Sequence, residues 1–265
     1  MPERIEKVGR YQWRDGSGEY DTDEVVVELP VALSYNGISH AVMMTTPTDL
    51  ADFALGFSVS EGILSGPQQL LGLDIVEREQ GLEIAMEITA GAFAGLKDKR
   101  RTLAGRSGCG LCGKESLEAL SFTPAPLPST LTIAHQALQL AQQTLQREQP
   151  LKAVTGGVHG AAWCDPDGSI VLVREDVGRH NALDKLLGAL CRSDRGQGFV
   201  VVTSRASYEM VIKAAACGVE LLAAVSAPTA LAVEQARAAG MSLVGYLQQG
   251  RHAVYTGDHR VEDKK

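Results

Sequence analysis

The chain has 265 residues, 45% of them hydrophobic and 22% charged, which is the composition of a folded globular protein and excludes a disordered or fibrous one. Its 25 basic and 32 acidic residues give a net charge of −7, so the surface as a whole is unsuited to binding nucleic acid. An anionic ligand would have to be bound by a local cluster of positive charge.

The cysteine content and the apolar stretches indicate the compartment. Five cysteines are an odd number, and a chain of this length does not need disulfides for stability, so we expect a reducing compartment. Residues 1–15 are rich in charge and lack the apolar core of a leader sequence. The longest apolar stretch, residues 221–233, is interrupted by Ser226 and Pro228 and is too short to cross a bilayer. The sequence therefore predicts a cytoplasmic protein without a membrane span.

The first third of the chain has the pattern of an α+β fold. Residues 24–46 read as two strands that are joined at Asn36-Gly37, where both residue types tolerate the positive φ of a tight hairpin turn. Thr48 offers an N-cap oxygen to a short helix with apolar residues at helical spacing. A second pair of alternating strands is predicted within residues 73–88.

The chain changes character in its middle. A basic cluster is followed by the glycine-rich sequence GRSGCGLCG, which contains Cys109 and Cys112 and which core packing of its own cannot hold. Three prolines within residues 122–129 disfavour helix and mark a domain boundary. We therefore predict an N-terminal α+β part, residues 1–128, that ends in a mobile CxxC loop, and a second domain over residues 129–265.

The second domain has a more regular pattern. Residues 131–147 predict a long amphipathic helix, and the turn sequence at 165–168 predicts a hairpin. Helices and strands then alternate with short connections, which is typical of a sheet with parallel neighbouring strands. The expected fold class is therefore α/β (α+β), with a mixed sheet flanked by helices in the second domain. The predicted helices cover residues 179–191, 207–216 and 229–239, and the predicted strands residues 161–164, 169–174, 199–203, 219–225 and 242–247.

The spacing of Cys109 and Cys112 allows several kinds of chemistry. Two such thiols can share a metal ion, form a disulfide, or pass a covalently bound group from one to the other. A metal site would need two more ligands, and no second CxxC or HxxxH pair supplies them. A dithiol oxidoreductase would place the motif after a buried strand, which is missing here. Arg106, Lys114 and a helix N-terminus would stabilise a thiolate, so a nucleophilic or carrier cysteine fits better.

Three connections between a predicted strand and the following helix carry polar and charged residues. In a sheet with parallel neighbours these strand ends meet at one edge, where helix N-termini favour anions. A large phosphate-bearing ligand would suit this edge. The candidate ligand-binding residues are Arg179, His180, Ser204 and Arg205. The alternative is that Asp176, Ser204 and Thr229 are ordinary helix caps, and His159 alone fits a buried structural histidine equally well.

Several sequence motifs resemble those of one family. They are GCGLCG at 108–113, TGGVH at 155–159, REDVGRHNALDK at 174–185, SRASYEM at 204–210 and LVGYLQQGRHAVYTG at 243–257. Together they resemble the FdhD family, sulfur carriers needed to make active formate dehydrogenase, and the likeness runs over residues 21–257. The resemblance implies a cytidine deaminase-like fold for the C-terminal domain, without the zinc site of the deaminases. This sequence agrees, because it lacks H-x-E followed by P-C-x-x-C.

The resemblance also implies a role for each cysteine of the CxxC pair. Cys109 would accept sulfur from a cysteine desulfurase as a persulfide, and Cys112 would help to receive or release it. The sulfur would then pass to the molybdenum cofactor, bis-molybdopterin guanine dinucleotide, before its insertion into the formate dehydrogenase apoenzyme. The protein would thus be a carrier-type sulfurtransferase that binds the cofactor as a substrate, has no catalytic metal of its own and forms a homodimer.

The resemblance places a second cofactor-binding segment near the C-terminus. Its residues are Tyr246, Leu247, Gln248, Gln249, Gly250 and Arg251. Related sequences often have a basic residue near position 248, where this chain has a neutral glutamine, so Arg251 is the remaining charge of the segment.

Two other functions remain open. A cofactor-binding chaperone would use the same fold without sulfur transfer, and its cysteines would be structural or bind zinc. A thiol-disulfide oxidoreductase would use the CxxC pair for electron transfer. The remaining cysteines, Cys164, Cys191 and Cys217, lie in strand and helix patterns, so we expect all three to be buried.

Overall fold

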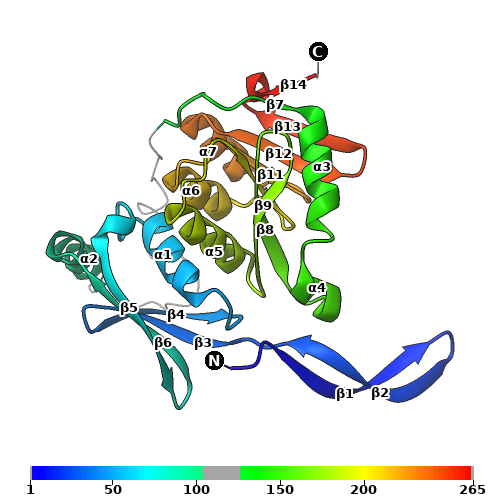
Figure 1. The fold of residues 1–265 in the computed structure, drawn as a ribbon, viewed down its shortest axis with the longest axis horizontal. Helices are drawn as coiled ribbons and strands as arrows, with labels where there is room; N and C mark the ends of the chain where they lie inside the picture. The colour runs from blue at the N-terminus through cyan, green and yellow to red at the C-terminus, as the bar shows by residue number, and fades with distance from the viewer. Residues whose placement is uncertain (1, 104–125, 264–265) are drawn as a thin grey trace.

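A mixed sheet forms the centre of the C-terminal part of the chain (Figure 1). The structure, a computed structural model, describes residues 2–103 and 126–263. The strand order is β13-β12-β11-β10-β8-β9, in which β10, β11 and β12 are parallel neighbours and the pairs with β8, β9 and β13 are antiparallel. This arrangement confirms the predicted α/β class. The strands are β8 (His159–Cys164), β9 (Ile170–Asp176), β10 (Phe199–Val202), β11 (Leu221–Ala224), β12 (Ser242–Gln248) and β13 (Arg251–Thr256).

Helices cover both faces of this sheet because successive strand side chains point to opposite sides. Val200 and Val202 of β10 pack against α5, α6 and α7, whereas Phe199 and Val201 pack against α3 on the other face. A short parallel pair of strands, β7 and β14, lies beside α3. The elements are α3 (His135–Leu145), α4 (Pro150–Thr155), α5 (Arg179–Cys191), α6 (Tyr208–Ala216), α7 (Ala230–Ala239), β7 (Ile133–Ala134), η3 (Asp258–Arg260) and β14 (Val261–Glu262).

The N-terminal part has its own sheet, in the order β4-β3-β6-β5, and its own apolar core. Helix α1 fills one face of this sheet with Phe53, Ala54 and Phe57 and joins it to the C-terminal part (Figure 1). The turn between β3 and β4 falls at Asn36-Gly37, as predicted. The elements are β3 (Leu29–Tyr35), β4 (Ile38–Thr45), α1 (Leu50–Ser60), η1 (Pro67–Gln69), β5 (Leu70–Arg78), β6 (Gly81–Ile88) and α2 (Ala90–Leu103).

The prediction of one continuous strand before Asn36 was wrong. The chain leaves the strand pattern at Val27-Glu28, and the preceding residues form a separate hairpin of β1 (Ile5–Arg14) and β2 (Ser17–Val26). This hairpin extends away from the two cores (Figure 1). None of its residues is buried, so the hairpin lacks the buried apolar face that identifies a half-buried strand.

Two helix starts and one whole helix also differ from the predictions. The helix expected from residue 131 begins only at His135, because the two residues before it pair with β14. Asp49, with a left-handed backbone, precedes α1 in place of Thr48, whose hydroxyl accepts a hydrogen bond from Lys185 Nζ (3.2 Å). The basic residues near position 100 belong to α2, a helix that the sequence did not predict.

No helix within the described residues is long and apolar enough to cross a membrane.

Helices α1 and α5 cross at a pair of glycines. A Cβ atom at Gly188 would overlap the carbonyl oxygen of Asp52, and one at Gly56 would overlap that of Asp184. The two backbones can approach this closely only because neither position has a side chain. The crossing is the largest contact between the N-terminal and C-terminal parts within the described residues.

We predict that Gly188→Ala destabilises the protein by about 3 kcal/mol, because packed backbone must move to accept the methyl group. Gly95→Ala is the matched control, since a Cβ at this position of α2 meets no atom of the described residues within 4 Å. The control should be neutral or more stable by up to about 1 kcal/mol, because alanine favours helix over glycine. Urea denaturation of both variants measures the difference, and equal midpoints would contradict the close crossing.

Candidate functional site

The carboxyl ends of β9, β10, β11 and β12 meet at one edge of the large sheet, as the sequence predicted for the three connections. Backbone hydrogen bonds join the segments along this edge. Thr203 donates its N–H to Gly160 O (3.0 Å), Ser226 to Ser204 O (3.4 Å), and Tyr246 to Ser226 O (3.1 Å). These bonds hold the end of each strand against the next, so the edge is a continuous polar rim.

The rim carries a charged cluster at the β9 end. Arg179 and His180 form the first turn of α5, and His180 Nε2 lies 2.8 Å from Glu209 Oε2 on α6. The hydrogen bond from His180 lowers the pKa of Glu209. His159 starts β8 directly opposite Asp176. Burial lowers the pKa of His159, and the positive charge of Arg179 lowers it further, so this imidazole is neutral near pH 7.

Two polar groups of this cluster are buried without a protein partner among the described residues. They are Nε of Arg179 and Oγ of Ser207, which precedes α6. A buried donor without a hydrogen bond costs free energy, so such groups favour a ligand that pairs with them. Both are donors beside a helix N-terminus, so the matching ligand group is an anion such as phosphate.

The other residues predicted for this end of the rim differ in their exposure. Arg205 is exposed, whereas Ser204 is buried and its hydroxyl donates to the carbonyl of Arg205 (3.0 Å). Ser204 therefore shapes the loop rather than capping a helix. Thr229 is an ordinary N-cap, since its hydroxyl accepts from Ala232 N (3.2 Å). The sequence left His159 unassigned and did not single out Ser207 or Glu209, because only the register of the sheet and the placement of α6 bring them to the cluster.

The C-terminal candidate segment forms the β12–β13 turn. A bulge in β12 places Tyr246 at a positive φ of 52°, and its side chain is 43% exposed. Leu247 points into the core, so only its backbone can reach a ligand. Gln248 Oε1 accepts from Arg251 Nε (2.9 Å), and Gly250 N–H donates to Gln139 Oε1 (2.8 Å). Gln249 is exposed at the turn itself.

The two clusters lie at different points of the same rim. Strand β9 is four positions from β12 in the sheet, which corresponds to roughly 19 Å at the usual spacing between strands. A ligand that reaches from the β9 end of the rim to the β12 end must therefore be elongated.

Asp176 lies beneath the rim and does not cap a helix, contrary to one alternative from the sequence. It is fully buried, and its carboxylate accepts from Gly178 N–H (2.8 Å), Asn181 Nδ2 (3.1 Å) and the N–H of Thr46 (3.0 Å). Lys185 Nζ is 2.7 Å from the same carboxylate. Burial lowers the pKa of Lys185, and Asp176 opposes that shift. This network attaches the end of β4 to the start of α5.

The predicted sulfur-carrying residues Cys109 and Cys112 lie outside the described residues. Of the cysteines that are described, Cys164 is buried as predicted, and burial raises its pKa to about 12. The prediction of burial was wrong for Cys191 and Cys217, which are both partly exposed.

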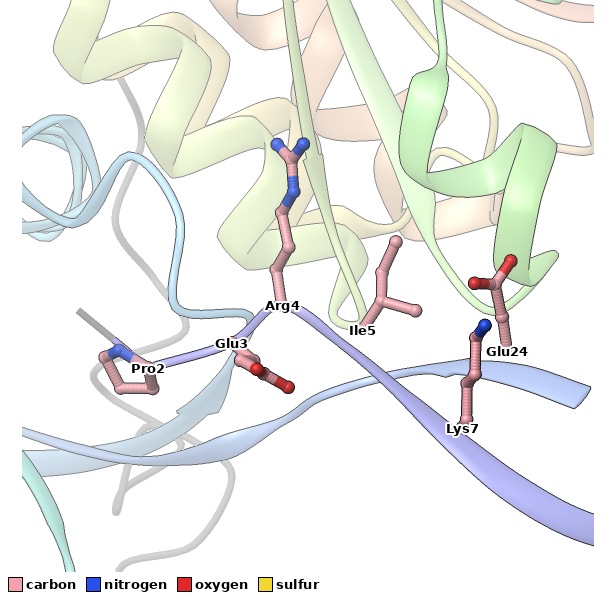
Figure 2. A pocket seen from close by; sticks show the side chains of 6 residues that line it. All are labelled: Pro2, Glu3, Arg4, Ile5, Lys7 and Glu24. Atoms are coloured by element: carbon pink, nitrogen blue, oxygen red, sulfur yellow. The ribbon is translucent and has the colours of Figure 1, made fainter.

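A shallow hollow lies where β1 begins (Figure 2). Side chains of both charges line it, and none of the predicted site residues takes part. Its lining residues are Pro2, Glu3, Arg4, Ile5, Lys7 and Glu24. Arg4 points away from the hairpin in Figure 2, and Lys7 and Glu24 are register partners across β1 and β2.

Comparisons with known proteins give consistent matches over most of the chain. The model of the FdhD/NarQ family matches residues 26–262. The sulfur carrier protein FdhD of Cupriavidus necator is 54% identical over 253 residues, which cover 95% of this chain and 88% of that relative. The protein of the same name from Variovorax paradoxus is 52% identical over 241 residues, 90% of this chain and 87% of the relative.

A solved structure illustrates the match of the fold. It is the crystal structure of a protein from Desulfotalea psychrophila that is described provisionally as a formate dehydrogenase accessory protein. The TM-score is 0.79 at 24% sequence identity, and the match covers 98% of this chain and 100% of the other. At this level of identity the likeness shows the fold alone.

We predict that Asp176→Ala destabilises the protein by about 3–5 kcal/mol, because it leaves Lys185 buried without its partner. Lys152→Ala is the control, since this lysine is exposed and its removal should change stability by less than about 0.5 kcal/mol. Chemical denaturation measures both variants. If Asp176→Ala unfolded at the same denaturant concentration as the control, the buried pair would not hold the two parts together.

Proposed function

The chain belongs to the FdhD/NarQ family, and on that premise we propose that it is a sulfur carrier in the maturation of formate dehydrogenase. Cys109 accepts sulfur as a persulfide from a cysteine desulfurase. The sulfur then passes to the molybdenum cofactor, bis-molybdopterin guanine dinucleotide, before this cofactor enters the apoenzyme. The observation that carries the cofactor part of the proposal is the polar rim, where buried donors of Arg179 and Ser207 have no protein partner within residues 2–103 and 126–263.

The sulfur transfer needs two thiols in sequence. The Cys109 thiolate attacks the outer sulfur of the desulfurase persulfide, and the desulfurase cysteine leaves as a thiolate. Cys112 then attacks the inner sulfur of the Cys109 persulfide, which forms a Cys109–Cys112 disulfide and releases hydrosulfide to the cofactor. A thiol reductant afterwards returns both cysteines to the reduced form. The chemistry is that of thiol-disulfide exchange, and the CxxC spacing allows it.

The rim suits the charge and length of such a cofactor. Guanine dinucleotides carry several phosphates, and Arg179, Ser207 and the first turn of α5 offer donors to an anion. The exposed ring of Tyr246 offers a surface on which a guanine base can stack. The separation of roughly 19 Å along the rim, from the strand spacing, matches an elongated ligand better than a single nucleotide.

The protein partners follow from the same proposal. They are a cysteine desulfurase, which supplies sulfur, and the formate dehydrogenase apoenzyme, which receives the completed cofactor. We further propose a cytoplasmic location, because free thiols persist in a reducing compartment. The homodimer is proposed from the family resemblance.

A cofactor chaperone without sulfur transfer is the second candidate. The described part of the chain favours it as well, because the rim residues that would bind the cofactor are independent of the CxxC pair. The two functions differ in what happens at Cys109, which either carries sulfur or holds structure or zinc.

We predict that incubation with a cysteine desulfurase and cysteine adds sulfur to Cys109, which intact-mass measurement detects and which a reductant removes. Cys109→Ala should abolish the added mass, whereas Cys164→Ala should retain it because that thiol is buried. The same Cys109→Ala variant should fail to restore formate dehydrogenase activity in cells that lack the native chain. A protein that gains no sulfur but contains one zinc ion per chain would support the chaperone instead.

We predict that Arg179→Ala weakens the binding of guanosine diphosphate, a probe for half of the cofactor, by about tenfold or more, because a charge-assisted hydrogen bond to phosphate is lost. The control is Arg147→Ala, an exposed arginine that follows α3 on the other face of the sheet. Titration calorimetry measures both variants. Equal affinities of the Arg179→Ala and Arg147→Ala variants for guanosine diphosphate would contradict a nucleotide site at the rim. The result on sulfur loading would be unaffected.

A further inference from the structure

Two thiols meet where α5 and α6 end. Cys191 is the last residue of α5, and Cys217 directly follows α6. Both side chains are partly exposed and free, and both pack against the same apolar core of the N-terminal part. The two thiols are near enough to shift each other's pKa, which Cys217 lowers for Cys191 and Cys191 raises for Cys217. They are therefore neighbours in the fold, and both are free.

The loop after α5 holds this pair in place. Arg195 Nη2 donates to the carbonyl oxygen of Cys217 (2.7 Å), and Arg195 in turn lies over the ring of Trp163, with 5.2 Å from its guanidinium carbon to the ring centroid. Trp163 Nε1 donates to the carbonyl oxygen of Arg195 (3.3 Å). These contacts connect the residues after Cys191 to Cys217 and place a fixed positive charge beside the pair.

The environment makes the two thiols unequal. The Cys217 thiol lowers the pKa of Cys191, burial opposes this shift, and the nearby Arg195 adds to it. The Cys191 thiol and burial raise the pKa of Cys217. Cys191 therefore ionises more readily than Cys217, and the thiolate is the reactive form of a thiol.

We propose that Cys191 and Cys217 form a second thiol pair, separate from the CxxC motif, which closes to an intramolecular disulfide by exchange with a small-molecule disulfide such as glutathione disulfide. The Cys191 thiolate attacks one sulfur of glutathione disulfide, which forms a mixed disulfide and releases glutathione as a thiolate. Cys217 then loses its proton and attacks the Cys191 sulfur, and the second glutathione leaves. Two protein thiols are oxidised, and one glutathione disulfide is reduced to two glutathiones.

The position of the two thiols determines what a disulfide between them does to helices α5 and α6. Helices α5 and α6 begin at the rim, with Arg179 and Ser207, and end at the thiol pair. Helix α5 has 13 residues and is about 20 Å long, so the disulfide forms at the end of the helices opposite to the rim. It fixes the two helices to each other without occupying the proposed cofactor site.

The test uses the full chain with Cys109→Ser and Cys112→Ser, so that the result does not depend on the proposed sulfur transfer. Under native conditions, glutathione disulfide should remove two hydrogens from the mass, and peptide mapping should find Cys191 joined to Cys217. Adding Cys217→Ser should stop the reaction at one stable glutathione adduct on Cys191. Adding Cys191→Ser should slow the modification about tenfold or more, because the remaining thiol has the higher pKa. Dithiothreitol should reverse each change.

A variant that also carries Cys164→Ser is the matched control, and it should still form the disulfide because Cys164 is buried in the separate core on the α3 face of the large sheet. Circular dichroism before the reaction verifies that each variant is folded, and Cys→Ala replacements repeat the test for any variant that is not. Independent glutathione adducts on Cys191 and Cys217, or no reaction at either thiol of the folded protein, would overturn the proposal.

Discussion

Buried charges whose ion pairs or hydrogen bonds are completed from the other part of the chain determine much of this fold. Lys185 and Asp176 are fully buried together, and Thr46 from the N-terminal part completes their hydrogen bonds. Lys213 of α6 is buried against Glu61, which follows α1. Burial by itself would lower the pKa of Lys213, but the neighbouring carboxylates raise it. Because a buried charge without its partner costs several kcal/mol, α5 and α6 depend on the N-terminal part for their stability.

Because of this constraint, one sequence motif both stabilises the fold and positions residues of the candidate site. In REDVGRHNALDK, Asn181 and Lys185 lie four residues apart, so they share the inward face of α5, and both contact the end of β4. Arg179 and His180 precede them in the first turn and lie at the rim. Asn181 and Lys185, which are buried, fix the first turn of α5 in place. That turn presents Arg179 and His180 to a ligand. Positioning and binding therefore depend on the same short sequence.

The sequence predicted the elements whose side chains alternate between core and solvent, and most of the second domain has that pattern. It did not predict the β1–β2 hairpin, where no face is buried, although Asp15-Gly16 is a typical tight turn and was the available signal. The rim was predictable because parallel strand ends must share an edge. The role of Asp176 was not, since its partner Thr46 lies 130 residues away and no local pattern connects them.

The proposed transfer requires a rigid surface that binds the cofactor and a thiol that can move between its partners. The fold anchors the chain on both sides of the segment that carries this thiol. Before the CxxC segment, Leu96 of α2 is buried in the N-terminal core. After it, Leu127 donates its N–H to Ala239 O at the end of α7 (2.9 Å), a helix that begins at the rim with Thr229. The segment that carries Cys109 is thus attached to one part at its start and to the other at its end. The buried charges that join the two parts therefore also set the distance that this segment spans.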